Sequence, residues 1–287
     1  MTRLLNGKPV AEAINERSLT LIEMLNEKDI TPTLAIFRIG EDASDLSYEK
    51  SAIKKCEELG VKVIKYVFEN DVEEEEFYEN LDRANNDSYI HGILVFRPLP
   101  EHFDKNMLRR RINPRKDVDA CSNASLAGLF IDKGAGFAPC TAQSAMEILD
   151  YYDIPISGKS VTVLGRSLVI GKPISMLMIN KDATVTICHT KTVNTAEIAS
   201  KADILITAIG KPEAIDKSYT NENQSIIDVG ISWSDEKKKL CGDMKFDEVK
   251  DYVKDITPVP GGVGSVTTAV LINHVVLAAI ELNGIQD

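Results

Sequence analysis

The segment "VTVLGRSLVIGKP", residues 161–173, has the residue types of a turn that binds an anion. A β-branched run ends at Gly165, and Gly171 follows six residues later, before an apolar helical pattern. A glycine lets the chain leave a buried strand sharply, and the helix after it points its N-terminal amides at an anion. The usual dinucleotide-binding fingerprint is G-x-G-x-x-G. Here the second glycine is missing, and Arg166 and Ser167 place a guanidinium and a hydroxyl in the turn, which suits a phosphate.

The next predicted strand, "ATVTIC", supports a nucleotide at this turn. It is followed by His189, Thr190, Lys191 and Thr192. In a nucleotide-binding sheet the end of the second strand lies near the adenosine ribose, where NAD sites commonly carry Asp or Glu. Hydroxyls and a lysine in that place favour a 2′-phosphate, so the predicted cofactor is NADP. Taken alone, the glycine turn is equally typical of a strand–helix connection that holds no ligand.

Strands and helices alternate along the chain, which predicts an α/β fold with mostly parallel sheets covered by helices. The first set of predicted elements is helix 10–25, strand 33–40, helix 44–59, strand 61–68, helix 72–84 and strand 91–96. The second set is helix 141–152, strand 160–165, helix 174–179, strand 183–188, helix 195–200, strands 203–210 and 225–230, and helix 268–283. We place the domain boundary near residues 137–141.

Composition limits the classes of function. A length of 287 residues suggests about two domains. The net charge is −11, and phosphate-backbone binding needs a basic face, so no nucleic-acid partner is expected. The acidic run 69–76 is interpreted as the solvated start of a helix rather than as a tail that binds a partner.

Cysteine and histidine usage predicts neither a metal site nor a disulfide framework. The four histidines are dispersed, and the five cysteines contain no C-x-x-C pair: Cys56, Cys121, Cys140, Cys188 and Cys241. Reduced thiols and a cytoplasmic location are therefore expected. The N-terminal segment lacks the apolar core of a signal peptide. No segment reaches about 18 consecutive apolar residues, so no membrane association is expected.

The order and spacing of several motifs resemble the methylenetetrahydrofolate dehydrogenase/cyclohydrolase family over about residues 2–283. The C-terminal motifs are "LGRSLVIGKP", "ATVTICHTKT", "ADILITAIGKP", "IIDVGI" and "TPVPGGVGSVT". The N-terminal motifs are "GEDASDLSYEKSAIKKCEELGV", "HGILVFRPLP", "INPRKDVDA" and "PCT".

The resemblance implies two α/β domains. Residues 1–139 and 268–287 would form a folate-binding domain, to which the C-terminal helix returns, and residues 140–267 a Rossmann-type NADP domain with a parallel sheet. Members of this family are typically homodimers. They oxidise methylenetetrahydrofolate with NADP and then hydrolyse the methenyl product, so a tetrahydrofolate derivative is the implied substrate.

The cofactor side of the family pattern is well kept. The pattern G-R-S-x-x-x-G-x-P is present, and Thr190 replaces the usual serine while keeping its hydroxyl. Ile231 matches a position that contacts the cofactor in relatives. The cofactor-binding residues implied by the resemblance are Gly165, Arg166, Ser167, Gly171, Thr190 and Ile231.

The folate side departs from the pattern. Tyr48 keeps the tyrosine of the family's Y-x-x-x-K, but Ala52 stands at the lysine. The family's "GILVQLPLP" is "GILVFRPLP", so Phe96 replaces the active-site glutamine. Asp119 matches the carboxylate that holds the pterin ring. The segments "ACSNASLAGL", "PCTA" and "GGVGSVT" also differ from the family's versions.

Tyr48 and Asp119 are the implied catalytic residues, and both also belong to the implied substrate site. The other substrate-binding candidates are Phe96 and, in the proline–glycine loop, Pro258, Gly261 and Gly262. Adjacent glycines suit close approach of the backbone to a flat ligand.

Each of these residues has a purely structural alternative. Tyr48 could be an ordinary half-buried aromatic residue, Asp119 could cap a helix beginning near Ser122, and loop 258–264 could be only an interdomain turn. Lys50 and Lys54 are expected to point away from the face of Ala52. Lys55 shares the face of Tyr48 but lies one turn beyond Ala52. It is the one neighbour that could stand in for the missing lysine.

The departures weigh differently on the two reactions. Hydride transfer requires mainly orientation of substrate and cofactor. Hydrolysis requires an activated water, and positioned acid–base groups contribute about 10²–10⁴-fold. The leading hypothesis is a dehydrogenase whose cyclohydrolase step is weak or absent. The alternatives are a full bifunctional enzyme that uses other groups, and a cofactor-binding relative without catalysis.

Overall fold

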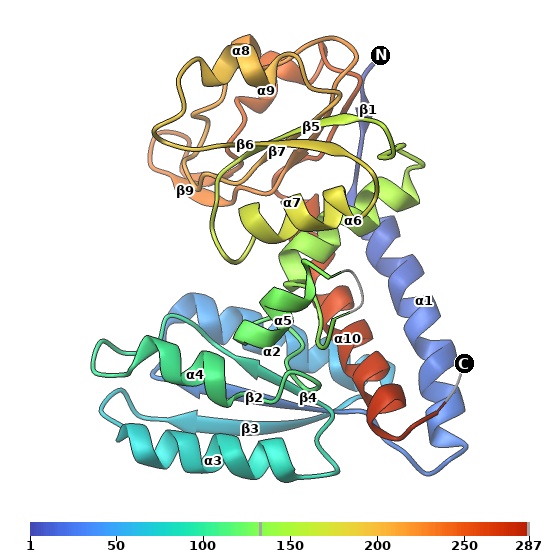
Figure 1. Ribbon diagram of the computed structural model, residues 1–287, viewed down its shortest axis with the longest axis vertical. Helices are drawn as coiled ribbons and strands as arrows, with labels where there is room; N and C mark the ends of the chain where they lie inside the picture. Colours follow the sequence, from blue (N-terminus) through green and yellow to red (C-terminus); the bar gives the residue numbers. More distant parts are fainter. Residues whose placement is uncertain (132–133, 286–287) are drawn as a thin grey trace. The chain divides into compact units, whose positions relative to one another are not determined.

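The computed structural model describes residues 1–131 and 134–285, and the chain divides into two compact units (Figure 1). The first unit contains residues 1–12 and 141–267, and the second contains residues 13–140 and the chain from Thr268 on. This division differs from the predicted domains at the N-terminus. Residues 1–12 join the first unit because strand β1 (Arg3–Leu4) pairs with strand β11 (Asp255–Ile256).

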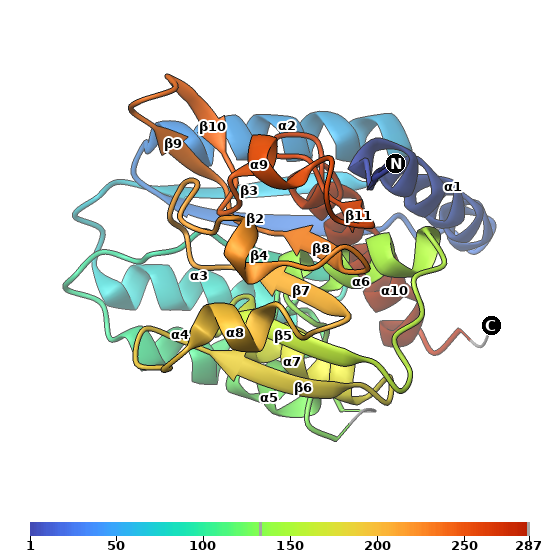
Figure 2. The ribbon, with the colours of Figure 1, turned by 90° about the horizontal axis from the view of Figure 1, so that it is seen from above.

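Within the described residues, the first unit carries a six-stranded sheet whose strand pairs are all parallel. Its order is β1-β11-β8-β7-β5-β6, and Figure 2 shows β8, β7, β5 and β6 side by side. The remaining strands are β5 (Ser160–Leu164), β6 (Thr184–Cys188), β7 (Ile204–Thr207) and β8 (Ser225–Asp228). The helices are α6 (Cys140–Tyr151), α7 (Gly171–Ile179), α8 (Thr195–Ala199) and α9 (Phe246–Val249), and β9 (Ser232–Ser234) pairs with β10 (Lys239–Cys241).

The strand order reverses at β5, because β6 lies on one side of it and β7 on the other. In open α/β sheets, ligands bind outside the carboxyl ends of the strands at such a reversal. Strands β7 and β8 are buried throughout, as central parallel strands are, while the edge strand β6 is mostly exposed. The ends of β5, β6 and β7 are therefore the place to look for a ligand site in this unit.

The second unit has a three-stranded parallel sheet in the order β3-β2-β4. Its strands are β2 (Thr33–Ile39), β3 (Lys62–Phe68) and β4 (Gly92–Val95). The helices are α2 (Ala43–Leu59), α3 (Glu74–Asn86), α4 (Lys105–Arg111) and α5 (Asn123–Gly128), with most of α1 (Gly7–Asn26) and α10 (Thr267–Leu282). Helix α3 begins inside the acidic run, where carboxylates favour a helix N-terminus, so that interpretation is confirmed.

Helices pack on both faces of the second sheet. On one face the Phe37 ring of β2 stacks on Tyr66, with centroids 4.3 Å apart, and meets Phe77 of α3 edge-on at 5.6 Å. On the other face a side chain at Gly92 would come within 2.8 Å of Val275 on α10. The two-domain α/β fold with parallel sheets is therefore confirmed.

No helix in the described ranges is long and apolar enough to cross a membrane. All five cysteines lie within these ranges as buried free thiols.

Two buried aspartates hold the carboxyl ends of β7 and β8 together. Asp228 accepts hydrogen bonds from the Thr207 hydroxyl at 2.9 Å and from the amides of Asp243 and Met244 at 3.0 and 2.9 Å. Asp243 in turn accepts from the Ile209 amide at 2.6 Å. Asp243, which follows β10, thus fixes the loop after β7, and Asp228, the last residue of β8, fixes the segment after β10.

The stability of the first unit should depend on the ionisation of Asp228. Burial raises the pKa of Asp228 from 3.8 to about 6, although the hydrogen bonds it accepts lower it. The folded state therefore holds this proton more tightly than the unfolded chain, and stability is lost as the pH rises from about 4 to about 6.

We expect the stability of the wild-type protein relative to Asp228→Asn to fall by up to about 3 kcal/mol over this range, measured by urea unfolding. A difference that stays constant with pH would contradict the assignment.

Candidate functional site

Two glycines make the turn after β5 possible. Gly165 has φ +122°, and a Cβ on it would lie 2.4 Å from the Ala208 carbonyl oxygen at the end of β7. A Cβ on Gly171, the first residue of α7, would lie 2.3 Å from the Gly165 carbonyl oxygen. The end of β5, the end of β7 and the start of α7 therefore touch through backbone atoms, and a larger residue at either glycine would separate them.

The groups between these glycines are directed to solvent. Arg166 and Ser167 are exposed, and the Ser167 hydroxyl accepts a hydrogen bond from the Ile170 amide at 3.1 Å. Within the described chain the amides of Ser167, Leu168 and Val169 have no hydrogen-bond partner. A guanidinium, a hydroxyl and free amides before a helix N-terminus form a donor set that fits a phosphate group.

The turn after β6 lies at the same edge of the sheet. The Gly165 amide donates to the Cys188 carbonyl at 2.9 Å, which ties the ends of β5 and β6 together. Thr190 and Lys191 are exposed just beyond, where the His189 Nδ1 accepts from the Lys191 amide at 3.2 Å. The structure therefore brings the predicted cofactor residues of both turns to one edge of the first unit, and this donor set fits the 2′-phosphate and pyrophosphate of NADP.

Ile231 lies at the end of β8, beyond the segment that Asp228 holds, and 55 % of its surface is exposed. The residue before it, Gly230, donates its amide to Asp228 at 3.1 Å. The apolar side chain is thus presented to solvent at the same sheet edge by a fixed backbone.

The proline–glycine loop belongs to the first unit, and contacts within the chain explain why glycines stand there. The Gly261 carbonyl, at φ +105°, accepts from the Gly7 amide at 2.8 Å. A Cβ on Gly262 would lie 2.5 Å from the Pro258 carbonyl oxygen. These glycines therefore meet the chain's own backbone, at Pro258 and at the start of α1, and the predicted approach to a flat ligand stays a prediction.

The second unit brings Tyr48 and Phe96 together. Tyr48 lies on α2 and Phe96 directly follows β4, and their rings meet edge-on with centroids 5.9 Å apart and planes at 81°. Ala52, one helical turn beyond Tyr48, is fully buried. The helix is anchored beside them, because Glu49 forms an ion pair with Arg38 of β2 at 2.7 Å with both side chains buried.

The lysines near Ala52 have other positions. Lys55 places its ammonium 3.0 Å from Glu58, further along α2 than Tyr48, and Lys54 lies 4.0 Å from the same carboxylate. Lys50 is exposed. For Lys55 to act in place of the family's lysine, its ammonium would therefore have to leave the Glu58 carboxylate.

Asp119 is held at both oxygens. Oδ1 accepts from the Cys140 amide, at the start of α6, at 2.8 Å, and Oδ2 accepts from Arg97 Nη2 at 2.9 Å. The alternative in which Asp119 caps the next helix is wrong, because Ser122 caps α5 and Asp117 accepts the Ser122 amide at 2.7 Å. Asp117 serves the backbone, and Asp119 is free to face a ligand with its remaining lone pairs.

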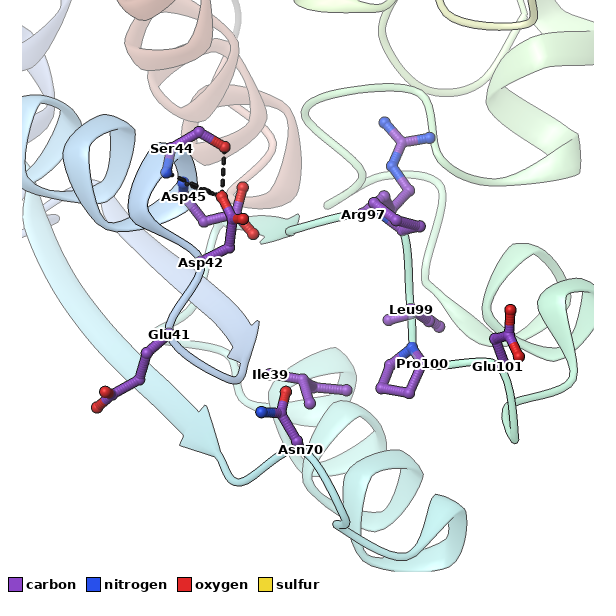
Figure 3. Close-up of a pocket in the computed structure, with 11 residues that line it drawn as sticks. Ile39, Glu41, Asp42, Ser44, Asp45, Asn70, Arg97, Leu99, Pro100 and Glu101 are labelled. Atoms are coloured by element: carbon purple, nitrogen blue, oxygen red, sulfur yellow. Dashed lines mark hydrogen bonds between the residues drawn. The ribbon is translucent and has the colours of Figure 1, made fainter.

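Sequence reasoning missed Arg97. The available signal was the same altered motif, since the arginine of "GILVFRPLP" stands at a leucine of the family pattern. Arg97 also lines a pocket of about 740 Å³ beside the end of β2 and the start of α2. Figure 3 shows its guanidinium directed away from Leu99 and Pro100. At the other side of the pocket, Asp42 accepts the Ser44 amide at 2.8 Å and begins α2.

Two family models match the chain. Residues 5–119 match the catalytic domain of tetrahydrofolate dehydrogenase/cyclohydrolase. Residues 139–283 match the NAD(P)-binding domain of the same family.

Full-length relatives match as well. The bifunctional protein FolD of Clostridium botulinum (strain Okra / Type B1) is 47% identical over 97% of this chain and 99% of its own length. The crystal structure of the FolD dehydrogenase/cyclohydrolase of Campylobacter jejuni is 33% identical, with a TM-score of 0.94, covering 98% of this chain and 99% of that one. The Trypanosoma brucei FolD, solved with NADP cofactor and an inhibitor, is 30% identical with a TM-score of 0.91, covering 100% and 99%.

The geometry of the β5 turn leads to a stability prediction. Gly165→Ala combines a left-handed φ with overlap against the backbone of Ala208, so we expect a loss of about 2–5 kcal/mol and loss of nucleotide binding. The matched control is Gly158→Ala, which has φ +73° but nothing within 4 Å of the added Cβ. The control should lose about 1–2 kcal/mol at most. Equal losses in thermal unfolding would show that close packing at Gly165 does not matter.

Proposed function

The chain belongs to the tetrahydrofolate dehydrogenase/cyclohydrolase family, and we propose that it oxidises methylenetetrahydrofolate to methenyltetrahydrofolate with a hydrolysis step that Ala52 and Phe96 leave weak or absent. The predicted dehydrogenase activity and the predicted cofactor NADP are confirmed by the family match and by the NADP-bound relative. NADP, when bound, supplies the hydride acceptor. We assign its phosphates to Arg166, Ser167 and Thr190 and the amides before α7, because these groups gather at one sheet edge.

The observation that supports weak hydrolysis is the set of side chains near Tyr48. Activation of a water needs a group that can take up a proton, and positioned acid–base help contributes about 10²–10⁴-fold. Ala52 and Phe96 offer neither an amine nor an amide, and the nearest lysine on the same helix face is paired with Glu58. Tyr48 and the phenyl ring can position a flat substrate, which is sufficient for hydride transfer.

A full bifunctional enzyme is the second candidate. It is favoured by the relative from Clostridium botulinum, which is named bifunctional and is 47% identical. In that case Lys55 is the first group to test, because leaving Glu58 would free its ammonium for the face of Tyr48.

We further propose a homodimer as the assembly and Asp119 and Tyr48 as substrate-contacting residues, with Pro258, Gly261 and Gly262 contributing from the loop. The homodimer follows from the family resemblance and the residue roles from the matched motifs. The cytoplasmic location stays a prediction that rests on the cysteine pattern.

The cofactor assignment predicts a selective loss. Arg166→Ala should weaken NADP binding by about one to two decades, because a lost charged hydrogen bond costs about 1.5–3 kcal/mol, and it should weaken NAD binding much less. Isothermal titration with each cofactor measures the difference. Lys181→Ala, an exposed lysine beyond the far end of α7, is the control for loss of one charge. Equal losses for NADP and NAD in Arg166→Ala would contradict the assignment.

The proposed function predicts that methenyltetrahydrofolate accumulates. With methylenetetrahydrofolate and NADP, NADPH should form, and the methenyl absorbance should decay only at its uncatalysed rate. Ala52→Lys alone should recover little hydrolysis, since the position is fully buried and desolvation lowers the pKa of an ammonium. Ala52→Lys with Phe96→Gln should recover more than the sum of the single changes, because the two groups act as a unit.

The unmodified protein decides between the two candidates. Clearance of the methenyl compound at an enzymic rate would establish the bifunctional enzyme, and Lys55→Met would then show whether that lysine activates the water. Absence of NADPH formation would remove both candidates.

A further inference from the structure

The contact between Arg97 and Asp119 combines a hydrogen-bond donor and an acceptor in one fixed arrangement. Arg97 Nη2 lies 2.9 Å from Asp119 Oδ2, and the two side chains are 29% and 23% exposed. The Cys140 amide holds the other carboxylate oxygen at 2.8 Å. The carboxylate is thus oriented from two sides, and the pair still reaches the surface.

Both partners keep hydrogen-bonding capacity. A carboxylate oxygen has two lone pairs, and a guanidinium has five N–H donors. Within the described residues, Arg97 makes one recorded hydrogen bond, to Asp119. An incoming ligand can therefore bind the pair without breaking it, provided that it offers an acceptor to Arg97 and a donor to Asp119.

Arg97 stays positively charged. Burial lowers the pKa of the guanidinium, but the neighbouring acidic groups Cys121, Asp119 and Asp117 raise it further than burial lowers it. A permanently charged group cannot activate water as a base. It can donate hydrogen bonds, so the role open to Arg97 is binding rather than acid–base catalysis.

An aromatic residue stands next to Arg97 in the sequence. Phe96 precedes Arg97 in the chain, and its ring meets Tyr48 edge-on at 5.9 Å. The proposed substrate carries a flat heterocycle, whose polar atoms lie at its edge. The chemistry complementary to a carboxylate beside a guanidinium is a ring N–H beside a carbonyl, which is a lactam edge.

We infer that Arg97 is a specificity-determining residue that reads the lactam edge of the pterin together with Asp119. The guanidinium donates to the ring carbonyl oxygen, and the carboxylate accepts from the adjacent ring N–H. This inference rests on the proposed function, because it takes a tetrahydrofolate derivative as the substrate.

A matched pair of ligands tests this reading in the intact protein. Folic acid has the lactam edge, whereas aminopterin carries an amino group in place of the carbonyl and lacks the ring N–H. The wild-type protein should prefer folic acid in isothermal titration. Arg97→Leu should lose roughly tenfold to hundredfold of the affinity for folic acid and lose the preference as well. Arg97→Lys should keep the charge but recover only part of the preference, because an ammonium lacks the planar fork.

Two controls separate recognition from folding and from bulk charge. Arg110→Leu removes an exposed arginine of α4 and should leave both affinities unchanged. NADP affinity should stay at the wild-type value in all variants. In the dehydrogenase assay, Arg97→Leu should raise KM for methylenetetrahydrofolate with little change in kcat, since a contact made equally in the ground state and in the transition state contributes uniform binding.

The outcomes distinguish this inference from the proposed function. An Arg97→Leu protein that keeps the wild-type affinity and preference would overturn the inference and leave Arg97 as a neutraliser of Asp119. NADPH formation by a wild-type protein with no preference for folic acid would also overturn it, while the proposed function stands. Preference for folic acid without NADPH formation would remove the proposed function and support the inference.

Discussion

Parallel sheets place many strand ends at one edge, and the amides of the loops that leave this edge need acceptors once they are buried. Aspartates supply them in both units. Asp243 holds the loop after β7, and Asp228 holds Gly230 after β8 and the segment after β10. Asp117, which bridges to β4, holds the Cys121 and Ser122 amides. A buried carboxylate with several amide donors is a strong and directional anchor. The exposed Ile231 follows Gly230, whose amide Asp228 holds, so its position depends on that anchoring.

Two aspartates in the segment 116–119 have different roles. Asp117 is almost fully buried and satisfies backbone amides and the Ser125 hydroxyl. Asp119, two residues later, accepts a hydrogen bond from one backbone amide at one oxygen and from Arg97 at the other. Local geometry therefore decides which carboxylate is structural and which is available to a ligand.

Much of the fold follows from local sequence patterns, because apolar runs of the right length and glycine turns mark its strands and helices. The predicted strands 33–40 and 160–165 correspond to β2 and β5, and the predicted helix 44–59 to α2. Strands β1 and β11 have two residues each, too few for any periodicity, so the N-terminal strand of the first unit was not predictable. The candidate site likewise has a part that the sequence predicted and a part that it did not. Glycine spacing marked the β5 turn, whereas the pairing of Arg97 with Asp119 joins residues 22 positions apart and exists only in the folded chain.

The pairing of β1 with β11 has a consequence for the order in which the protein can fold. Arg3 contacts Asp255 across a sequence separation of 252 residues, so the edge of the first sheet closes only when nearly the whole chain has been synthesised. The second unit, by contrast, has the pairing of β2 with β3 and β4 within about one third of the chain. Contacts of low sequence separation form faster than distant ones. The strand pairs of the three-stranded sheet can thus form early, whereas β1 waits for β11 and the face of that sheet at Gly92 waits for α10.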